Sequence, residues 1–214
     1  MPLTSLLQPR QLVRRGLEEL DLARTELEPL SRVLGQLAEL LARWSARMNL
    51  TAHGDAETVV RRLILDAVAL DRQLPDVSSM VDLGSGAGFP GLPIALLHPE
   101  RRVTLVESRE RRYHFQRAAV RELGIGNAIL RLGRVEALAP EPCPLVTAQA
   151  MAAPRQAVAW MLPWAEPGGI LALPLAADQP PPGSFEGVGE ASISPYVVPL
   201  GGARRVLWLA RKKS

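Results

Sequence analysis

One short stretch, residues 81–91, constrains the fold of this chain more than any other, because it reads Val-Asp-Leu-Gly-Ser-Gly-Ala-Gly-Phe-Pro-Gly. An apolar run precedes the glycines at 80–83, and an apolar run of helical character follows them at 92–97. Glycine adopts positive φ at little cost and lets the backbone approach a ligand closely. A strand that passes through such a turn into a helix is typical of nucleotide-binding loops in doubly wound sheets. The stretch therefore predicts a strand–loop–helix unit with a ligand at its turn.

The rest of the chain after Ser79 alternates short apolar runs with helical stretches. We expect strands at 80–83, 103–107, 128–132, 145–148 and 169–173, with helices at 92–97, 110–123 and 156–164. This alternation is typical of an α/β fold with a parallel, doubly wound sheet. Residues 174–189 are rich in proline and glycine and are expected to form a loop. Two closing strands, at 193–198 and 204–210, are expected to form a hairpin across Gly201-Gly202, which makes seven strands in all.

Residues 1–75 predict helices only. An early helix is expected at 9–24, and a second from Leu30, with Pro29 in its first turn and Trp44 on its buried stripe. A third helix is expected to begin after Asp55, whose side chain suits an N-cap. We therefore expect an N-terminal helical extension, 1–75, followed by a ligand-binding α/β domain, 76–214.

Composition excludes several classes of protein. Hydrophobic residues make up 47% of the chain and charged residues 22%, which argues against a disordered protein. A lone cysteine, Cys143, excludes a disulfide framework and a zinc finger, and no apolar run approaches the roughly 18 residues of a membrane span. We expect a cytoplasmic monomer without a metal. All but two of the 25 basic residues are arginine, which suits phosphate contacts, although solvated helix faces explain such a bias equally well.

Two cofactors compete for the glycine turn. Residues 86–91 satisfy the dinucleotide pattern G-x-G-x-x-G, and Glu107 follows at the end of the second strand, where a carboxylate accepts hydrogen bonds from ribose hydroxyls. Asp82 favours the other choice, because a pyrophosphate disfavours a nearby carboxylate, whereas S-adenosylmethionine carries a cationic sulfonium and ammonium. The helices ahead of the sheet and the closing strand pair also suit a methyltransferase better.

The chain resembles the RsmG (glucose-inhibited division protein B) family, bacterial methyltransferases that modify N7 of a guanine in small-subunit ribosomal RNA. The resemblance covers residues 37–173, and the ending Phe89-Pro90-Gly91 makes its loop far more specific than the glycines alone. The motifs that carry it are Trp44 with Met48-Asn49-Leu50-Thr51, Ile64-Leu65-Asp66, the loop from Asp82 to Gly91, Val106-Glu107-Ser108 and Gly133-Arg134-Val135-Glu136.

The resemblance implies a Rossmann-like class I S-adenosylmethionine-dependent methyltransferase fold, with Glu107 on the ribose and Val135 and Glu136 at the adenine. Together with the loop, it places these residues at the cofactor: Asp82, Gly84, Gly86, Phe89, Glu107, Val135, Glu136 and Gln149. Guanine N7 has a free lone pair, so no general base is required, and we name no catalytic residue. The implied partner is small-subunit ribosomal RNA or the assembled subunit. Arginines near the ligand edge and on the helical extension are the candidates for contact with it, first among them Arg43, Arg47, Arg109 and Arg134. Further candidates for RNA contact include Arg111, Arg112 and the tail residues Arg204, Arg205, Arg211, Lys212 and Lys213.

Three departures from the family pattern fall near the expected RNA side. Gln149 stands where the family has an arginine, Leu63 where it has a histidine, and Leu173-Pro174-Leu175 where it has lysine-glycine. A weakly active or inactive relative that binds cofactor or RNA therefore stays open as a second interpretation, and a nicotinamide-dependent oxidoreductase as a third.

Overall fold

The computed structural model describes residues 8–48 and 50–213, which form a helical layer and a twisted sheet. Within these ranges the sheet has seven strands, in the spatial order β3-β2-β1-β4-β5-β7-β6. The first five are parallel, and β7 pairs antiparallel with both β5 and β6. The strands are β1 (Ser79–Leu83), β2 (Arg102–Glu107), β3 (Ala128–Leu132), β4 (Cys143–Ala148), β5 (Ala165–Ala176), β6 (Val188–Val197) and β7 (Arg204–Lys212). The predicted doubly wound sheet with a closing hairpin is confirmed.

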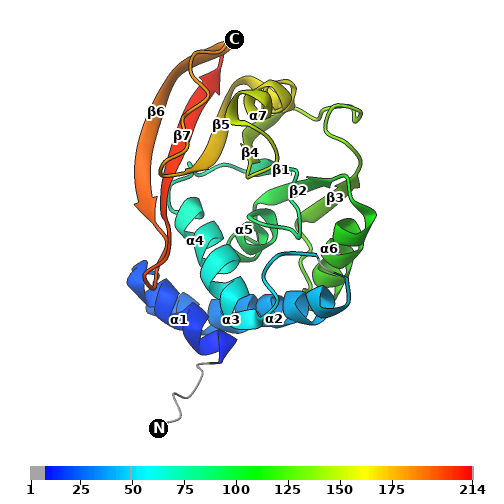
Figure 1. The fold of residues 1–214 in the computed structure, drawn as a ribbon, viewed down its shortest axis with the longest axis vertical. Helices are drawn as coiled ribbons and strands as arrows, with labels where there is room; N and C mark the ends of the chain where they lie inside the picture. The colour runs from blue at the N-terminus through cyan, green and yellow to red at the C-terminus, as the bar shows by residue number, and fades with distance from the viewer. Residues whose placement is uncertain (1–7, 49, 214) are drawn as a thin grey trace.

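The helices lie on both faces of this sheet, with α1 and α2 along one end of the molecule and α7 at the other (Figure 1). A π-helical turn, Val60–Ile64, joins α3 to α4, and a 3-10 turn, Leu162–Trp164, follows α7. The helices are α1 (Pro9–Glu19), α2 (Arg24–Met48), α3 (Ala56–Val59), α4 (Leu65–Asp71), α5 (Gly91–Leu97), α6 (Glu110–Leu123) and α7 (Pro154–Met161).

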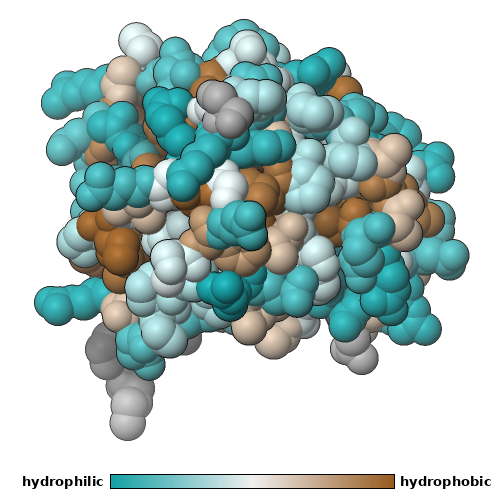
Figure 2. All heavy atoms as spheres, turned by 90° about the horizontal axis from the view of Figure 1, so that it is seen from above, coloured by the Kyte–Doolittle hydropathy of each residue, from teal (hydrophilic) through white to brown (hydrophobic). Residues whose placement is uncertain are grey.

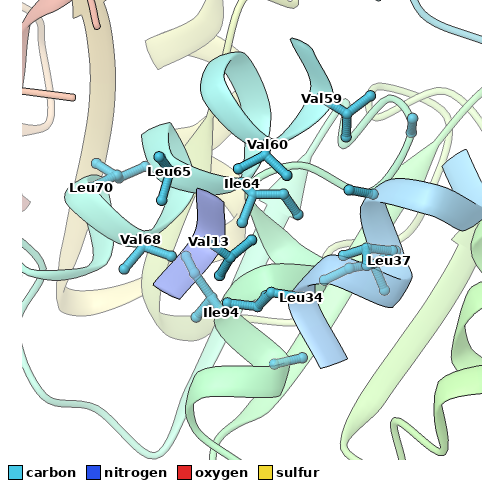
Figure 3. Packing of buried hydrophobic residues seen from close by; sticks show 14 of the residues in the cluster. Val13, Leu34, Leu37, Val59, Val60, Ile64, Leu65, Val68, Leu70 and Ile94 are labelled. Atoms are coloured by element: carbon cyan, nitrogen blue, oxygen red, sulfur yellow. The ribbon is translucent and has the colours of Figure 1, made fainter. Parts of the chain in front are cut away.

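Side chains alternate between the two faces of each strand, and each face has its own hydrophobic cluster. In β1, Met80 packs with the residues of α1, α2, α4, α5 and α6, whereas Val81 and Leu83 pack with those of α7. Figure 3 shows the helical part of the first cluster, where Val13 of α1 and Leu34 of α2 meet the α4 side chains. The helices before β1 and the sheet therefore share one hydrophobic core.

The N-terminal helices differ from their expected bounds in two ways. The first ends at Glu19 rather than near residue 24, and α2 begins at Arg24, so that Pro29 lies inside it. Burial of Leu27 and ion pairs from Arg10 and Arg14 to Glu28 hold this first part of α2 against α1, which offsets the hydrogen bond that the proline cannot donate. The predicted N-cap is confirmed, since Asp55 accepts a hydrogen bond from the Thr58 N–H at 2.8 Å.

The strands near the carboxyl end are longer than expected. The predicted loop at 174–189 is wrong at both ends, because β5 continues to Ala176 and β6 begins at Val188. Pairing of β5 with β4 ends at Ala172, so a proline at position 174 has only β7 beside it, and its missing N–H costs little there. The turn between β6 and β7 contacts α1, because the Leu200 N–H donates to Glu19 at 2.9 Å.

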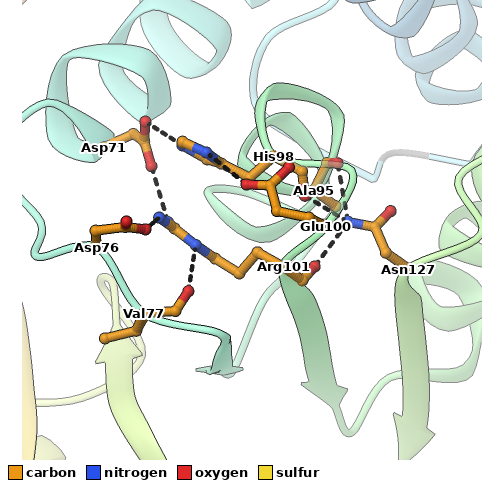
Figure 4. Close-up of polar contacts among 8 residues, drawn as sticks. All are labelled: Asp71, Asp76, Val77, Ala95, His98, Glu100, Arg101 and Asn127. Carbon is orange, nitrogen blue, oxygen red and sulfur yellow. Dashed lines mark hydrogen bonds and ion pairs between the residues drawn. The ribbon is translucent and has the colours of Figure 1, made fainter.

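A polar cluster closes the end of the sheet opposite its carboxyl edge (Figure 4). Arg101, whose side chain is 4% exposed, contacts Asp71 at 3.2 Å and donates to the Val77 carbonyl at 3.1 Å. Asp71 also bonds to His98 at 2.8 Å, and this bond raises the pKa of His98 above its ordinary value. The Asn127 amide donates to three carbonyls of the segment 95–101. The cluster therefore ties α4, α5 and the connection to β2 together.

The surface seen from above carries mostly hydrophilic side chains, with hydrophobic ones in separate patches (Figure 2). In the part of the chain that the structure describes, no helix is long and apolar enough to cross a membrane.

Candidate active site

A cavity of about 970 Å³ opens at the carboxyl edge of the sheet, where the parallel strands end. This volume lies at the upper end of the range for small-molecule sites, about 300–1,000 Å³. Among its lining residues are seven of those expected at the cofactor: Gly84, Gly86, Phe89, Glu107, Val135, Glu136 and Gln149. Asp66 of α4 lines it as well. The structure thus brings together residues from the ends of β1, β2, β3 and β4.

The glycine loop after β1 depends on positive φ at three glycines and is held by one side chain from α6. Gly84, Gly86 and Gly88 have φ of 65°, 60° and 89°, a region that other residues rarely adopt. The buried Gln116 amide donates to Ser85 Oγ and to the Gly86 carbonyl, both at 2.8 Å. A Cβ on Gly84 would lie 2.8 Å from Met151 Cβ, so the loop leaves no room for a side chain there.

Glu107 ends β2 with its carboxylate at the cavity wall, although the residue is only 3% exposed. One oxygen accepts a hydrogen bond from the Arg109 N–H at 2.7 Å, and the other lies 3.9 Å from the Arg112 guanidinium. A carboxylate has about four acceptor positions, so this one retains the capacity to accept two hydroxyl groups.

Val135 and Glu136 follow β3 and line the cavity beyond Glu107. The Gly133 N–H donates to the Glu107 carbonyl at 2.9 Å, which fixes this turn against the end of β2. Val135 is buried, whereas Glu136 is exposed, so Val135 supplies an apolar wall on this side of the cavity.

Asp82 lies beneath the loop instead of lining the cavity, in contrast to its expected place at the cofactor. Alternation along β1 turns it toward the face covered by α5, where one oxygen accepts a hydrogen bond from the Gly91 N–H at 2.9 Å. Its other oxygen has no hydrogen-bond partner among the described residues. Burial raises the pKa of Asp82 to about 8, so its carboxyl group is protonated at neutral pH and holds the start of α5.

Replacing Asp82 with asparagine is expected to flatten the pH dependence of stability. Between its ordinary pKa of 3.8 and about 8, the folded protein keeps a proton that the unfolded chain releases. The free energy of unfolding therefore falls as pH rises in this window, by about 1.4 kcal/mol per pH unit. Urea unfolding from about pH 6 to about pH 7.5 should show wild type losing roughly 2 kcal/mol relative to Asp82→Asn. Parallel pH profiles would contradict this assignment.

Gln149, at the end of β4, meets Asp66 at the side of the cavity away from Glu107. The Gln149 amide donates to Asp66 at 3.2 Å, and Arg205 of β7 contacts the same carboxylate at 2.8 Å. Sequence reasoning did not select Asp66 for the site, although an acid within the apolar run 63–70 is a usable signal. It likewise did not separate Arg205 from the other tail arginines, even though Arg205 shares a strand face with the buried Leu207.

The expected RNA-contacting residues fall into two groups. Arg109 and Arg134 line the cavity, as do Arg62 and Arg112, whereas Arg43 and Arg47 lie exposed on α2 and do not line it. Because of the direction of β7, the tail residues lie at two opposite ends of the strand. Arg205, the second residue of β7, lies at the cavity edge, while Arg211 and Lys212 lie at the far end of the strand and donate to the carbonyls of Gly168 and Ala165. Asn49, a residue of the pre-sheet motif, lies outside the described residues.

Comparisons of sequence identify relatives. A family model described as GidB, rRNA small subunit methyltransferase G, matches residues 31–177. A protein named ribosomal RNA small subunit methyltransferase G from Halorhodospira halophila is 41% identical over 144 residues, 67% of this chain and 68% of that protein. Relatives of the same name are 42% identical in Stenotrophomonas maltophilia, over 59% of this chain and 57% of theirs, and 32% identical in Neisseria meningitidis serogroup A, over 78% and 79%.

Solved structures share the fold. A predicted O-methyltransferase from Agrobacterium tumefaciens has a TM-score of 0.57 at 21% identity, covering 69% of this chain and 81% of its own. M. jannaschii TYW2 in complex with AdoMet has a TM-score of 0.54 at 12% identity, covering 71% and 76%. The predicted Rossmann-like class I methyltransferase fold is therefore confirmed. Because the family model spans more than half of the residues, the chain belongs to the rRNA small subunit methyltransferase G family.

Proposed function

We propose that this protein transfers a methyl group from S-adenosylmethionine to N7 of a guanine in small-subunit ribosomal RNA. The observation that carries the proposal is one cavity in which the glycine loop, the Glu107 carboxylate and the turn at Val135 and Glu136 lie together. Membership of the family supports the same reaction and argues against a nicotinamide-dependent oxidoreductase.

The residues present fit the cofactor. Gly84 and Gly86 leave backbone exposed at the cavity, where a Cβ on Gly86 would meet only an Arg112 nitrogen, at 3.9 Å. Glu107 would hold the ribose hydroxyls, and Val135 and Glu136 would hold the adenine between an apolar wall and main-chain groups. When bound, S-adenosylmethionine supplies an electrophilic methyl group on a cationic sulfur.

The chain's own contribution is positioning and exclusion of water. Guanine N7 presents an unprotonated lone pair, so attack requires no proton removal. Holding two reactants in line supplies much of the rate enhancement in such a reaction. Of the three histidines, only His53 lines the cavity, while His98 belongs to the polar cluster of Figure 4 and His114 is exposed on α6.

Arginines would hold the RNA. Arg62, Arg109, Arg112 and Arg134 line the cavity, and the guanidinium fork suits phosphate oxygens. Affinity for the substrate should therefore fall steeply with salt. Action on ribosomal RNA would place the protein in the cytoplasm.

Ribosomal RNA from a deletion strain tests this proposal. Mass spectrometry should show the loss of one 7-methylguanosine from small-subunit RNA, restored by the intact gene and not by a Glu107→Gln copy. Purified protein should then methylate small subunits from the deletion strain. An unchanged modification map would contradict the proposal, and binding of S-adenosylhomocysteine without turnover would favour the non-catalytic relative instead.

A further inference from the structure

Four side chains from distant parts of the chain meet beside the end of the cavity away from Glu107, and three of them line it. Asp66 is the centre of this group, which we call the Asp66 cluster: Asp66, Gln149, Tyr196 and Arg205. Arg205 contacts Asp66 at 2.8 Å, Gln149 donates to it at 3.2 Å, and the Tyr196 hydroxyl donates to it at 3.4 Å. Asp66 is 4% exposed, so the cluster is built into the protein and is not a surface ion pair.

The order of strands places this cluster beyond the glycine loop. Along the carboxyl edge, β2 ends in Glu107, β1 ends in the glycine loop, and β4 ends next to Gln149. Because β7 runs antiparallel, its first residues, including Arg205, lie at this same edge. Residues for the ribose and adenine occupy the β1 to β3 side of the cavity, so the β4 to β7 side remains for the base.

An inventory of donors and acceptors shows what the cluster offers to a ligand. Asp66 already accepts three hydrogen bonds, and burial and the Asp66 carboxylate raise the pKa of Tyr196, which stays a neutral donor. Arg205 has five N–H groups, and Asp66 accepts a hydrogen bond from only one of its terminal nitrogens. Its side chain is 28% exposed and lines the cavity, so N–H groups at the end of the guanidinium that Asp66 does not take remain available to a ligand. The cluster therefore offers donors.

Guanine has acceptors on the edge that reacts. Its O6 lies beside N7, whereas adenine carries an amino donor in the same place, and arginine is the commonest specific partner of this edge. N7 must stay free to take the methyl group, which leaves O6 for a donor. We infer that Arg205, oriented by Asp66, donates hydrogen bonds to O6 of the target base and selects guanine over adenine. This inference rests on the proposed function.

The pairing with Asp66 also suits the charge that the reaction creates. Methylation joins the N7 lone pair to the methyl carbon, whose bond to sulfur breaks with its electron pair left on sulfur, so the base becomes cationic. An unpaired guanidinium at O6 would oppose that charge. Asp66 cancels the charge of Arg205 while leaving its N–H groups available to the ligand.

A cycle of variants and bases tests the inference. Small subunits are reconstituted with guanine or 2-aminopurine, which lacks O6, at the methylated position, and kcat/KM is measured for wild type and Arg205→Gln. The kcat/KM of wild type should be about 30-fold lower on 2-aminopurine than on guanine. The kcat/KM of Arg205→Gln on guanine should be about 30-fold below that of wild type, and it should fall little further on 2-aminopurine. Affinity for S-adenosylhomocysteine should stay within about twofold, since the cofactor residues are unchanged.

Two further variants complete the design. Arg205→Gln leaves Asp66 without its cation, so the double variant Asp66→Asn with Arg205→Gln removes both charges and should show the same loss of guanine preference. Arg72→Gln, an exposed arginine just beyond α4, is the matched control and should behave like wild type. Equal preference for guanine in wild type and either Arg205 variant overturns the inference. Absence of methyl transfer by wild type overturns the proposed function instead.

Discussion

Replacing Glu107 with glutamine is expected to weaken binding of S-adenosylhomocysteine about 100-fold, because hydrogen bonds to a charged acceptor contribute about 1.5–3 kcal/mol each. Glu107 is 3% exposed, and its carboxylate is fixed by the Arg109 N–H, so it is already oriented before a ligand arrives. Glutamine keeps one acceptor oxygen but turns an amide donor toward a ribose hydroxyl. Calorimetric titration of the full chain measures the loss directly.

The matched control is Glu110→Gln, which removes the same charge from the first turn of α6, outside this cavity. A second variant, Gly84→Val, should abolish binding for a different reason. Gly84 has φ of 65°, and a Cβ there would lie 2.8 Å from Met151 Cβ, so valine would both strain the turn and narrow the cavity. Wild-type affinity in Glu107→Gln and Gly84→Val would show that the ligand binds elsewhere.

Asp71→Ala is expected to lower the free energy of unfolding by about 3 kcal/mol, because it leaves a buried arginine without its main partner. Arg101 is 4% exposed and contacts Asp71 at 3.2 Å (Figure 4). Asp71 also raises the pKa of His98, so its bond to His98 adds stability when that ring is protonated. The effect should therefore be largest below the ordinary His98 pKa of 6.5 and shrink as pH rises through the raised value. Urea unfolding at several pH values measures both the loss of unfolding free energy and its dependence on pH.

Asp76→Ala is the control for this cluster, because Asp76 contacts the same arginine but its side chain is fully exposed. It should change stability little. Neither variant should alter the affinity of the folded protein for S-adenosylhomocysteine, since the cluster lies at the opposite end of the sheet from the cavity. A loss below about 1 kcal/mol in Asp71→Ala would show that water replaces the carboxylate without cost.

The parallel sheet could be predicted because each of its βα units carries a local signal. Apolar runs of four to six residues and the glycine turn depend on neighbouring residues alone, and Asp55 caps its helix through a residue three positions away. The bounds of α2 and β5 could not be predicted in this way. Pro29 and Pro174 suggest an end to each element, yet packing against α1 and pairing with β7 extend both elements past these prolines.

In the candidate site, too, some features could be predicted from local sequence and others depend on tertiary structure. The glycine loop follows β1 directly, and Glu107 ends β2. Parallel strands end at the same edge of a sheet, so the order of strands and helices in the sequence predicts that the loop and Glu107 lie close together. The position of Asp82 beneath the loop, with its raised pKa, depends on which face of β1 the α5 helix covers. The Asp66 cluster joins residues up to 139 positions apart, and no periodicity within one segment specifies such contacts.

By itself, then, the sequence determined the order of strands and helices, the glycine turn after β1 and the place of Glu107 at the end of β2. These features arise from residues that are near neighbours in the chain and from the alternation of side chains along a strand. Only the tertiary structure decided which arginine meets Asp66, because the antiparallel course of β7 returns Arg205 to the edge where the parallel strands end.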